Sequence, residues 1–214
     1  MGLDLVCIIA NKYNTSEIIN IKEEVDSWHD IQQFVLNYRK SENSQYQNNE
    51  MGAEWEYDVS EVGLEKIWEY LESRGQKRIN IYIGLNRISN FFADIRFNRK
   101  TIIVQPSPEH KYANLHDPRR AKYLITLIRL IASKFQQKEI IYCVDSMFPP
   151  GLLYHESNAG LSFEALKKLG IDEFGTPSNN INNGMKNLFF FDHIENKLPV
   201  IKAWNWGDFK YKDE

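Results

Sequence analysis

The segment from Pro118 to Gln136 restricts the possible folds of this chain more than any other. Read as a helix, it is apolar almost all the way round, with one polar stripe made of Arg119, Lys122, Thr126, Arg129 and Ser133. A helix of this kind belongs in the middle of a fold, packed against other elements on most sides. Asp117 followed by Pro118 predicts where it begins, because this pair combines an N-cap with proline at the first helical position.

Strand patterns lie on both sides of this helix in the sequence. Residues 5–10 and 139–145 are nearly continuous apolar runs, which are typical of strands buried on both faces. Residues 79–83 alternate isoleucine with polar residues, and residues 91–106 indicate a hairpin turning at Asn98, Arg99 and Lys100. A second hairpin is expected over residues 187–204, turning at Glu195 and Asn196.

Three further helices are expected, over residues 27–40, 60–74 and 162–169, and residues 11–15 are expected to turn the chain. Ser27 and Asp30 resemble a capping box, and Gly170 is the predicted stop of the last helix. Strands joined first through helices and then by hairpins predict an α/β (mixed α+β) fold. We expect a single domain over residues 1–214, with helices packed on a mixed sheet of about six to seven strands that includes two β-hairpins.

Composition narrows the class of protein. The chain is 43% hydrophobic and its aromatic residues are spread along the whole length, which favours one folded body. It has no basic leader and no apolar run of roughly 20 residues, so we expect a cytoplasmic protein without a membrane segment. Cys7 and Cys143 are interpreted as small buried hydrophobes, since two thiols far apart in sequence fit neither a metal site nor a disulfide framework.

The net charge of -3 conceals a strong segregation of charge along the chain. Residues 1–75 carry a net charge of -9, residues 76–140 a net charge of +9, and residues 141–214 a net charge of -3. Acidic and aromatic residues are mixed in the segment that begins near residue 50, and residues 41–59 are predicted to form a mobile acidic surface loop. The candidate binding residues are Glu50, Glu54, Trp55, Glu56, Tyr57, Asp58 and Glu61.

Two interpretations of this acidic segment remain open. It is either a solvated polar surface, as most charge runs are, or a docking surface for a basic protein such as a toxin. Aromatic anchors inside an acidic rim supply the buried contact and the electrostatic steering that tight, fast association requires.

The stretch YCVDSMFPPGLLYHESNAG, residues 142–160, is the best candidate for a catalytic loop. Asp145 stands at the end of a predicted strand, where catalytic groups often gather, and it would orient His155 if the loop folded back. Ser146 or Ser157 would then be the nucleophile, or Glu156 a second carboxylate, with His116 facing the same cleft. Ordinary turn chemistry explains the same residues, and neither serine lies in a G-x-S-x-G elbow.

Arg119 and Arg120 mark a possible anion site, because they follow His116 at the start of the predicted central helix. The basic residues of segment 96–129 offer a route to nucleic-acid binding, which the pI of about 6.0 and the acidic counter-segment disfavour. These residues are Arg96, Arg99, Lys100, Arg119, Lys122 and Arg129.

The common cofactor and metal motifs are absent from the sequence, so it predicts no cofactor and no metal. Asn, Lys and Ile usage and the acidic aromatic surface favour a bacterial binding protein of the immunity type, which neutralises a basic protein partner. A hydrolase using Asp145, His155 and His116 is the alternative, and a regulatory nucleic-acid binder is the second alternative. The oligomeric state cannot be read from the sequence.

Overall fold

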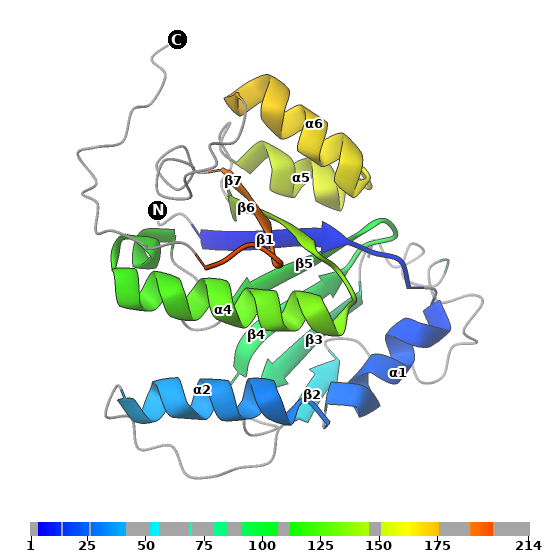
Figure 1. Ribbon diagram of the computed structural model, residues 1–214. Helices are drawn as coiled ribbons and strands as arrows, with labels where there is room; N and C mark the ends of the chain where they lie inside the picture. The colour runs from blue at the N-terminus through cyan, green and yellow to red at the C-terminus, as the bar shows by residue number, and fades with distance from the viewer. Residues whose placement is uncertain are drawn as a thin grey trace.

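A seven-stranded sheet forms the centre of the computed structural model, with the strand order β2-β3-β4-β5-β1-β6-β7 (Figure 1). The structure describes residues 4–13, 15–25, 27–41, 52–55, 69, 79–84, 91–106, 112–145, 151–175 and 189–198. The strands are β1 (Asp4–Ala10), β2 (Gly52–Trp55), β3 (Ile79–Gly84), β4 (Phe91–Phe97), β5 (Thr101–Pro106), β6 (Glu139–Asp145) and β7 (Phe190–His193). The α/β class is confirmed.

Every neighbouring pair of described strands is antiparallel, so the expectation of a mixed sheet is wrong for this part of the chain. The reason lies in β1, which pairs with β5 on one side and with β6 on the other. Strands β5 and β6 therefore run parallel to each other, as a helical crossover between them requires, but β1 separates them. This is a split β-α-β arrangement, with a strand from the start of the chain inserted into the crossover unit.

Strand β1 carries a separate core on each of its faces. Leu5, Cys7 and Ile9 belong to the larger core, which also contains the buried side of helix α4 (Pro118–Lys134). Val6 and Ile8 belong to a second core, which lies under helices α5 (Leu152–Asn158) and α6 (Phe163–Phe174). We call these two sides of the sheet the α4 face and the α5 face. The prediction that residues 5–10 are buried on both faces is confirmed for Leu5 to Ile9, which are all fully buried.

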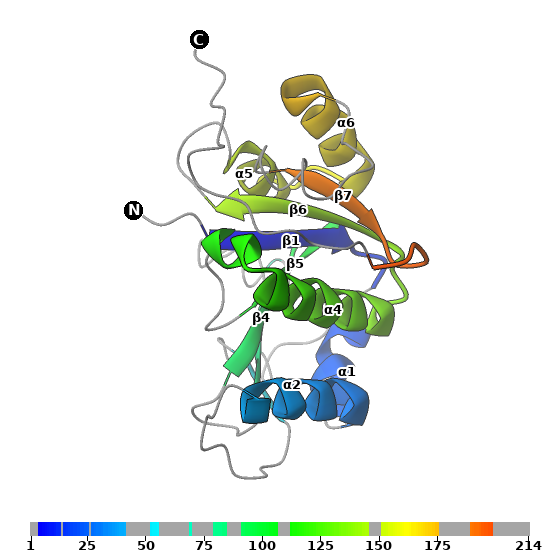
Figure 2. The ribbon, with the colours of Figure 1, turned by 60° about the vertical axis from the view of Figure 1, so that its left-hand side comes forward.

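Helix α4 runs along the α4 face beside β5, with α2 (His29–Ser41) packed against it (Figures 1 and 2). Its N-cap is Asp117, whose side chain accepts hydrogen bonds from the backbone N–H groups of Arg119 and Arg120, and Pro118 follows at the first position, as predicted. The Tyr123 ring stacks on Tyr38 with centroids 3.6 Å apart, which joins α4 to α2. The nearly all-round apolar composition of α4 thus serves two contacts at once, one with the sheet and one with α2.

The segment 142–160 differs from the expected catalytic loop. Residues 152–158 form α5, which packs on β6 and β1, so His155, Glu156 and Ser157 lie on a helix rather than in a Pro/Gly loop. The spacing of apolar residues did not indicate this helix. The helix has only seven residues, and two of its buried residues, Leu153 and Tyr154, are consecutive rather than three or four positions apart.

Helix α6 begins at Phe163, directly after its N-cap Ser162 and within one residue of the predicted start, but it continues beyond the predicted stop Gly170 to Phe174. Gly170 sits inside the helix because Phe189 packs directly over its Cα, and a Cβ at this position would lie 2.7 Å from the Phe189 ring. The C-terminal glycine is Gly175, with φ 84, a left-handed conformation that suits glycine.

Residues 15–25, expected in part as a turn, form helix α1 (Thr15–Val25) with Ile18, Ile21 and Val25 buried. Helix α2 starts at His29 rather than Ser27, and the Ser27 hydroxyl donates to the Glu24 carbonyl oxygen, 2.6 Å away, instead of capping α2. Asp30, the other half of the expected capping box, instead forms an ion pair with Lys134 of α4 at 2.7 Å. The α1 pattern is present in the sequence, since its buried residues recur at helical spacing.

Strand β3 and the β4–β5 hairpin agree with the sequence predictions, and the hairpin turns at residues 98–100 as expected. Strand β2 occupies residues 52–55, within the segment for which a surface loop was expected. These residues form a strand because they pair with β3, which lies more than 20 positions further along the chain and so leaves no local signal in the sequence. The predicted helix over residues 60–74 lies outside the described residues apart from Glu69, which is helical. Of the last hairpin, β7 and the turn at 194–196 are described, and residues 199–204 of its second arm are not.

Candidate functional site

Strand β2 is part of the acidic aromatic segment, and it is the terminal strand of the sheet among the strands described (Figure 1). Glu54 and Trp55 lie on this strand, where their Cα partners on β3 are Tyr82 and Ile81. The other candidate binding residues lie outside the described residues; they are Glu50, Glu56, Tyr57, Asp58 and Glu61. Strand β2 therefore places this part of the acidic segment at one end of the sheet.

The register across β2, β3, β4 and β5 sorts the sheet into alternating rows. Trp55 shares its row with Ile81, Ile95 and Val104, and the last two are fully buried in the larger core. The next row contains Glu54, Tyr82, Asp94 and Gln105. Because successive residues of a strand point to opposite faces, Ile95 and Val104 lie on the α4 face, and Asp94 and Gln105 lie on the α5 face.

A network centred on Arg96 joins the polar side of β4 to α5. Its Nε donates to Asp94 at 2.8 Å, its Nη1 to the Tyr154 hydroxyl at 2.7 Å and its Nη2 to Gln105 at 2.8 Å. Burial by itself would lower the pKa of Arg96, but the Asp94 carboxylate, with smaller contributions from Tyr154 and Asp145, raises that pKa instead. Arg96 is therefore a charged structural link between β4, β5 and α5.

Ser157 takes part in a second polar contact between α5 and the β4–β5 hairpin. Its side chain is completely buried and its Oγ lies 2.7 Å from the Thr101 hydroxyl, while the Asn98 amide donates to the Ser157 carbonyl oxygen at 3.2 Å. A buried hydroxyl in this network anchors the helix and is closed to a substrate. The structure therefore assigns Ser157 an architectural role.

Asp145 does lie at a strand end, as predicted. It is half-buried at the last position of β6, directly opposite Asp4 of β1. His155 is exposed on α5, and its ring stands edge-on to Tyr154 with centroids 5.4 Å apart. Ser146 lies outside the described residues.

His116 lies on the other side of the sheet from His155. It ends a short 3-10 helix, η2 (Tyr112–His116), that leads into α4, and the neighbouring Leu115 is buried in the core of the α4 face. Leu153 and Tyr154, which flank His155 on α5, belong to the core of the α5 face. The structure thus does not bring Asp145, His155 and His116 into the common cleft that the hydrolase alternative requires.

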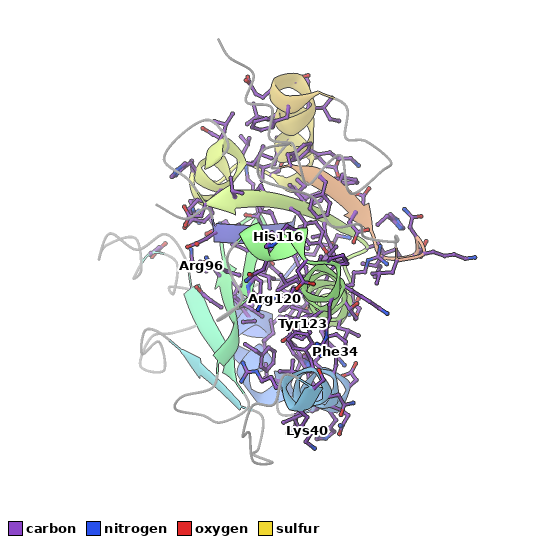
Figure 3. All side chains as sticks on the ribbon, turned by 90° about the vertical axis from the view of Figure 1, so that its left-hand side faces the viewer. Phe34, Lys40, Arg96, His116, Arg120 and Tyr123 are labelled. Atoms are coloured by element: carbon purple, nitrogen blue, oxygen red, sulfur yellow. The ribbon has the colours of Figure 1, made fainter. Side chains whose placement is uncertain are left out.

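The start of α4, proposed from the sequence as an anion site, is occupied by the protein's own groups. The Asp117 carboxylate accepts from the Arg119 N–H at 2.8 Å and from the Arg120 N–H at 3.4 Å. The Arg119 guanidinium donates to the Ser41 hydroxyl at 2.8 Å and that of Arg120 to Asn114 at 3.1 Å. Figure 3 shows Arg120 beside His116 and Tyr123, above Phe34 and Lys40 of α2.

The basic residues of segment 96–129 do not form one surface. Arg96 is engaged on the α5 face, whereas Arg129 of α4 forms a buried ion pair with Asp192 of β7, with Nη2 and Oδ1 2.6 Å apart. Asp192 is buried and His193 half-buried, in the alternating pattern of β7. The Arg129–Asp192 ion pair has no local signal in the sequence, because the two residues lie 63 positions apart.

The part of the chain that the structure describes contains no cluster of three or more His, Cys, Asp or Glu side chains arranged to hold a metal ion. None of the helices in this part is long and apolar enough to cross a membrane.

Comparison with known proteins leaves the chain without an assigned family. No protein-family model, no curated protein and no solved structure matches it.

Proposed function

We propose that this protein is a non-enzymatic bacterial binding protein of the cytoplasm that neutralises a basic protein partner, in the manner of an immunity protein bound to its toxin. The observation that carries the proposal is the position of β2, which is the described part of the acidic aromatic segment, as the terminal strand among those described. Residues 42–65 contain seven acidic residues and no Lys or Arg, and this segment includes β2 at the end of the sheet. A terminal strand inside a sequence segment with seven acids and no Lys or Arg favours a positively charged protein partner.

Two features of the described residues support binding over catalysis. The histidines proposed for a hydrolase lie on opposite faces of the sheet, and the buried Ser157 is committed to Thr101 and Asn98. The basic residues Arg96 and Arg129 are held by the carboxylates of Asp94 and Asp192, so neither guanidinium is available to a nucleic acid as an unpaired charge.

The test is capture of a partner on the immobilised protein, followed by measurement of its association rate at low and moderate salt. The variant Glu50→Lys/Glu54→Lys/Asp58→Lys reverses three acids of the segment. The matched control Glu164→Lys/Asp172→Lys/Glu173→Lys makes the same change in net charge at exposed positions of α6.

We expect the first variant to slow association at least tenfold at low salt and the α6 control to have a much smaller effect. Co-expression with the native protein should suppress the activity of the captured partner. Equal association rates for the native protein and the segment variant would refute the proposed function.

A further inference from the structure

We draw no further inference here: the strongest candidate, the surface patch that combines the half-buried Phe34 ring with the exposed Lys40 and Lys122 at the contact between α2 and α4, carries no proposal, because residues 42–51, which follow α2 in the chain, lie outside the described residues and nothing in the structure shows what covers the patch.

Discussion

Arg129 and Asp192 form a two-point ion pair that fastens the central helix α4 to strand β7. The Arg129 Nε donates to Oδ2 at 2.8 Å and its Nη2 to Oδ1 at 2.6 Å, and Nη1 reaches the Asn196 carbonyl oxygen at 2.9 Å. The Asp192 carboxylate also lies 3.5 Å from the Tyr142 hydroxyl, which is completely buried in β6. The ion pair thus connects α4 with β7 and with the turn after it, and its carboxylate also reaches the sheet core at Tyr142.

Removing one member of this ion pair should strongly destabilise the fold. Asp192→Ala would leave the Arg129 guanidinium largely buried without its carboxylate, which is expected to cost about 3–5 kcal/mol in the free energy of unfolding, measured with urea. The control is Lys138→Ala, which breaks an exposed pair with Glu195 and should cost under about 1 kcal/mol. Similar costs for the two variants would contradict this account.

The pKa of Tyr142 makes the stability of the fold sensitive to alkaline pH. Burial, reinforced by the Asp192 carboxylate, raises the pKa of Tyr142 well above its ordinary value of about 10. The folded protein therefore keeps a proton that the unfolded chain releases, so this contribution is complete below about pH 10 and is lost as the pH rises further.

The variant Tyr142→Phe tests this pH dependence. It should change the stability little at pH 7, because the hydroxyl contact is long, and should reduce the fall in unfolding free energy above pH 10 by up to about 1.4 kcal/mol per pH unit. Denaturant titrations between pH 8 and 11 provide the measurement. Parallel curves for the two proteins would rule out Tyr142 as the cause.

Gly170→Ala should destabilise the fold, although alanine usually stabilises a helix relative to glycine. Gly→Ala at an unobstructed helical site stabilises by about 0.5–1 kcal/mol. At Gly170 the added methyl group would lie 2.7 Å from the Phe189 ring and 3.3 Å from Leu153, so Gly170→Ala should destabilise by about 1–3 kcal/mol.

The Phe189→Leu background supplies the control, since the substitution removes the obstructing part of the ring. Gly170→Ala should cost less there than in the native protein, and thermal or urea unfolding measures both. A stabilising effect of Gly170→Ala in the native background would show that α6 does not pack on Phe189 as described.

Tyr154 should couple energetically to Arg96. Tyr154→Phe removes an acceptor of the charged guanidinium at 2.7 Å and should cost about 1.5–3 kcal/mol, because hydrogen bonds to charged groups are stronger than neutral ones. The control Tyr13→Phe removes a longer hydrogen bond, 3.4 Å, to the Lys134 carbonyl oxygen and should cost less. A double-mutant cycle with Arg96→Met should give a coupling energy above about 0.5 kcal/mol, and additive costs would contradict the contact.

Much of this fold could be predicted from local sequence patterns, because the spacing of apolar residues reflects which side of a helix or strand is buried. The alternation in residues 79–83, the turn at Asn98–Lys100 and the Asp117–Pro118 start of α4 all have local physical causes, so they were readable without the fold. The same local logic failed at Gly170, where a contact with Phe189 allows glycine within a helix. It also failed at β2, whose pairing with β3 comes from a segment beyond its own neighbours.

The candidate site shows the same division between local and long-range information. The sequence by itself determined the segregation of charge, the burial of β1 on both faces and the identity of the acidic segment, since these depend on which residues are adjacent in the chain. Only the tertiary structure decided that β1 separates β5 from β6, that His116 and His155 lie on opposite faces and that β2 is the terminal strand among those described. The reason is physical. The burial of one side of an element appears in the sequence as a regular spacing of apolar residues, whereas which elements lie side by side depends on contacts between segments far apart in sequence.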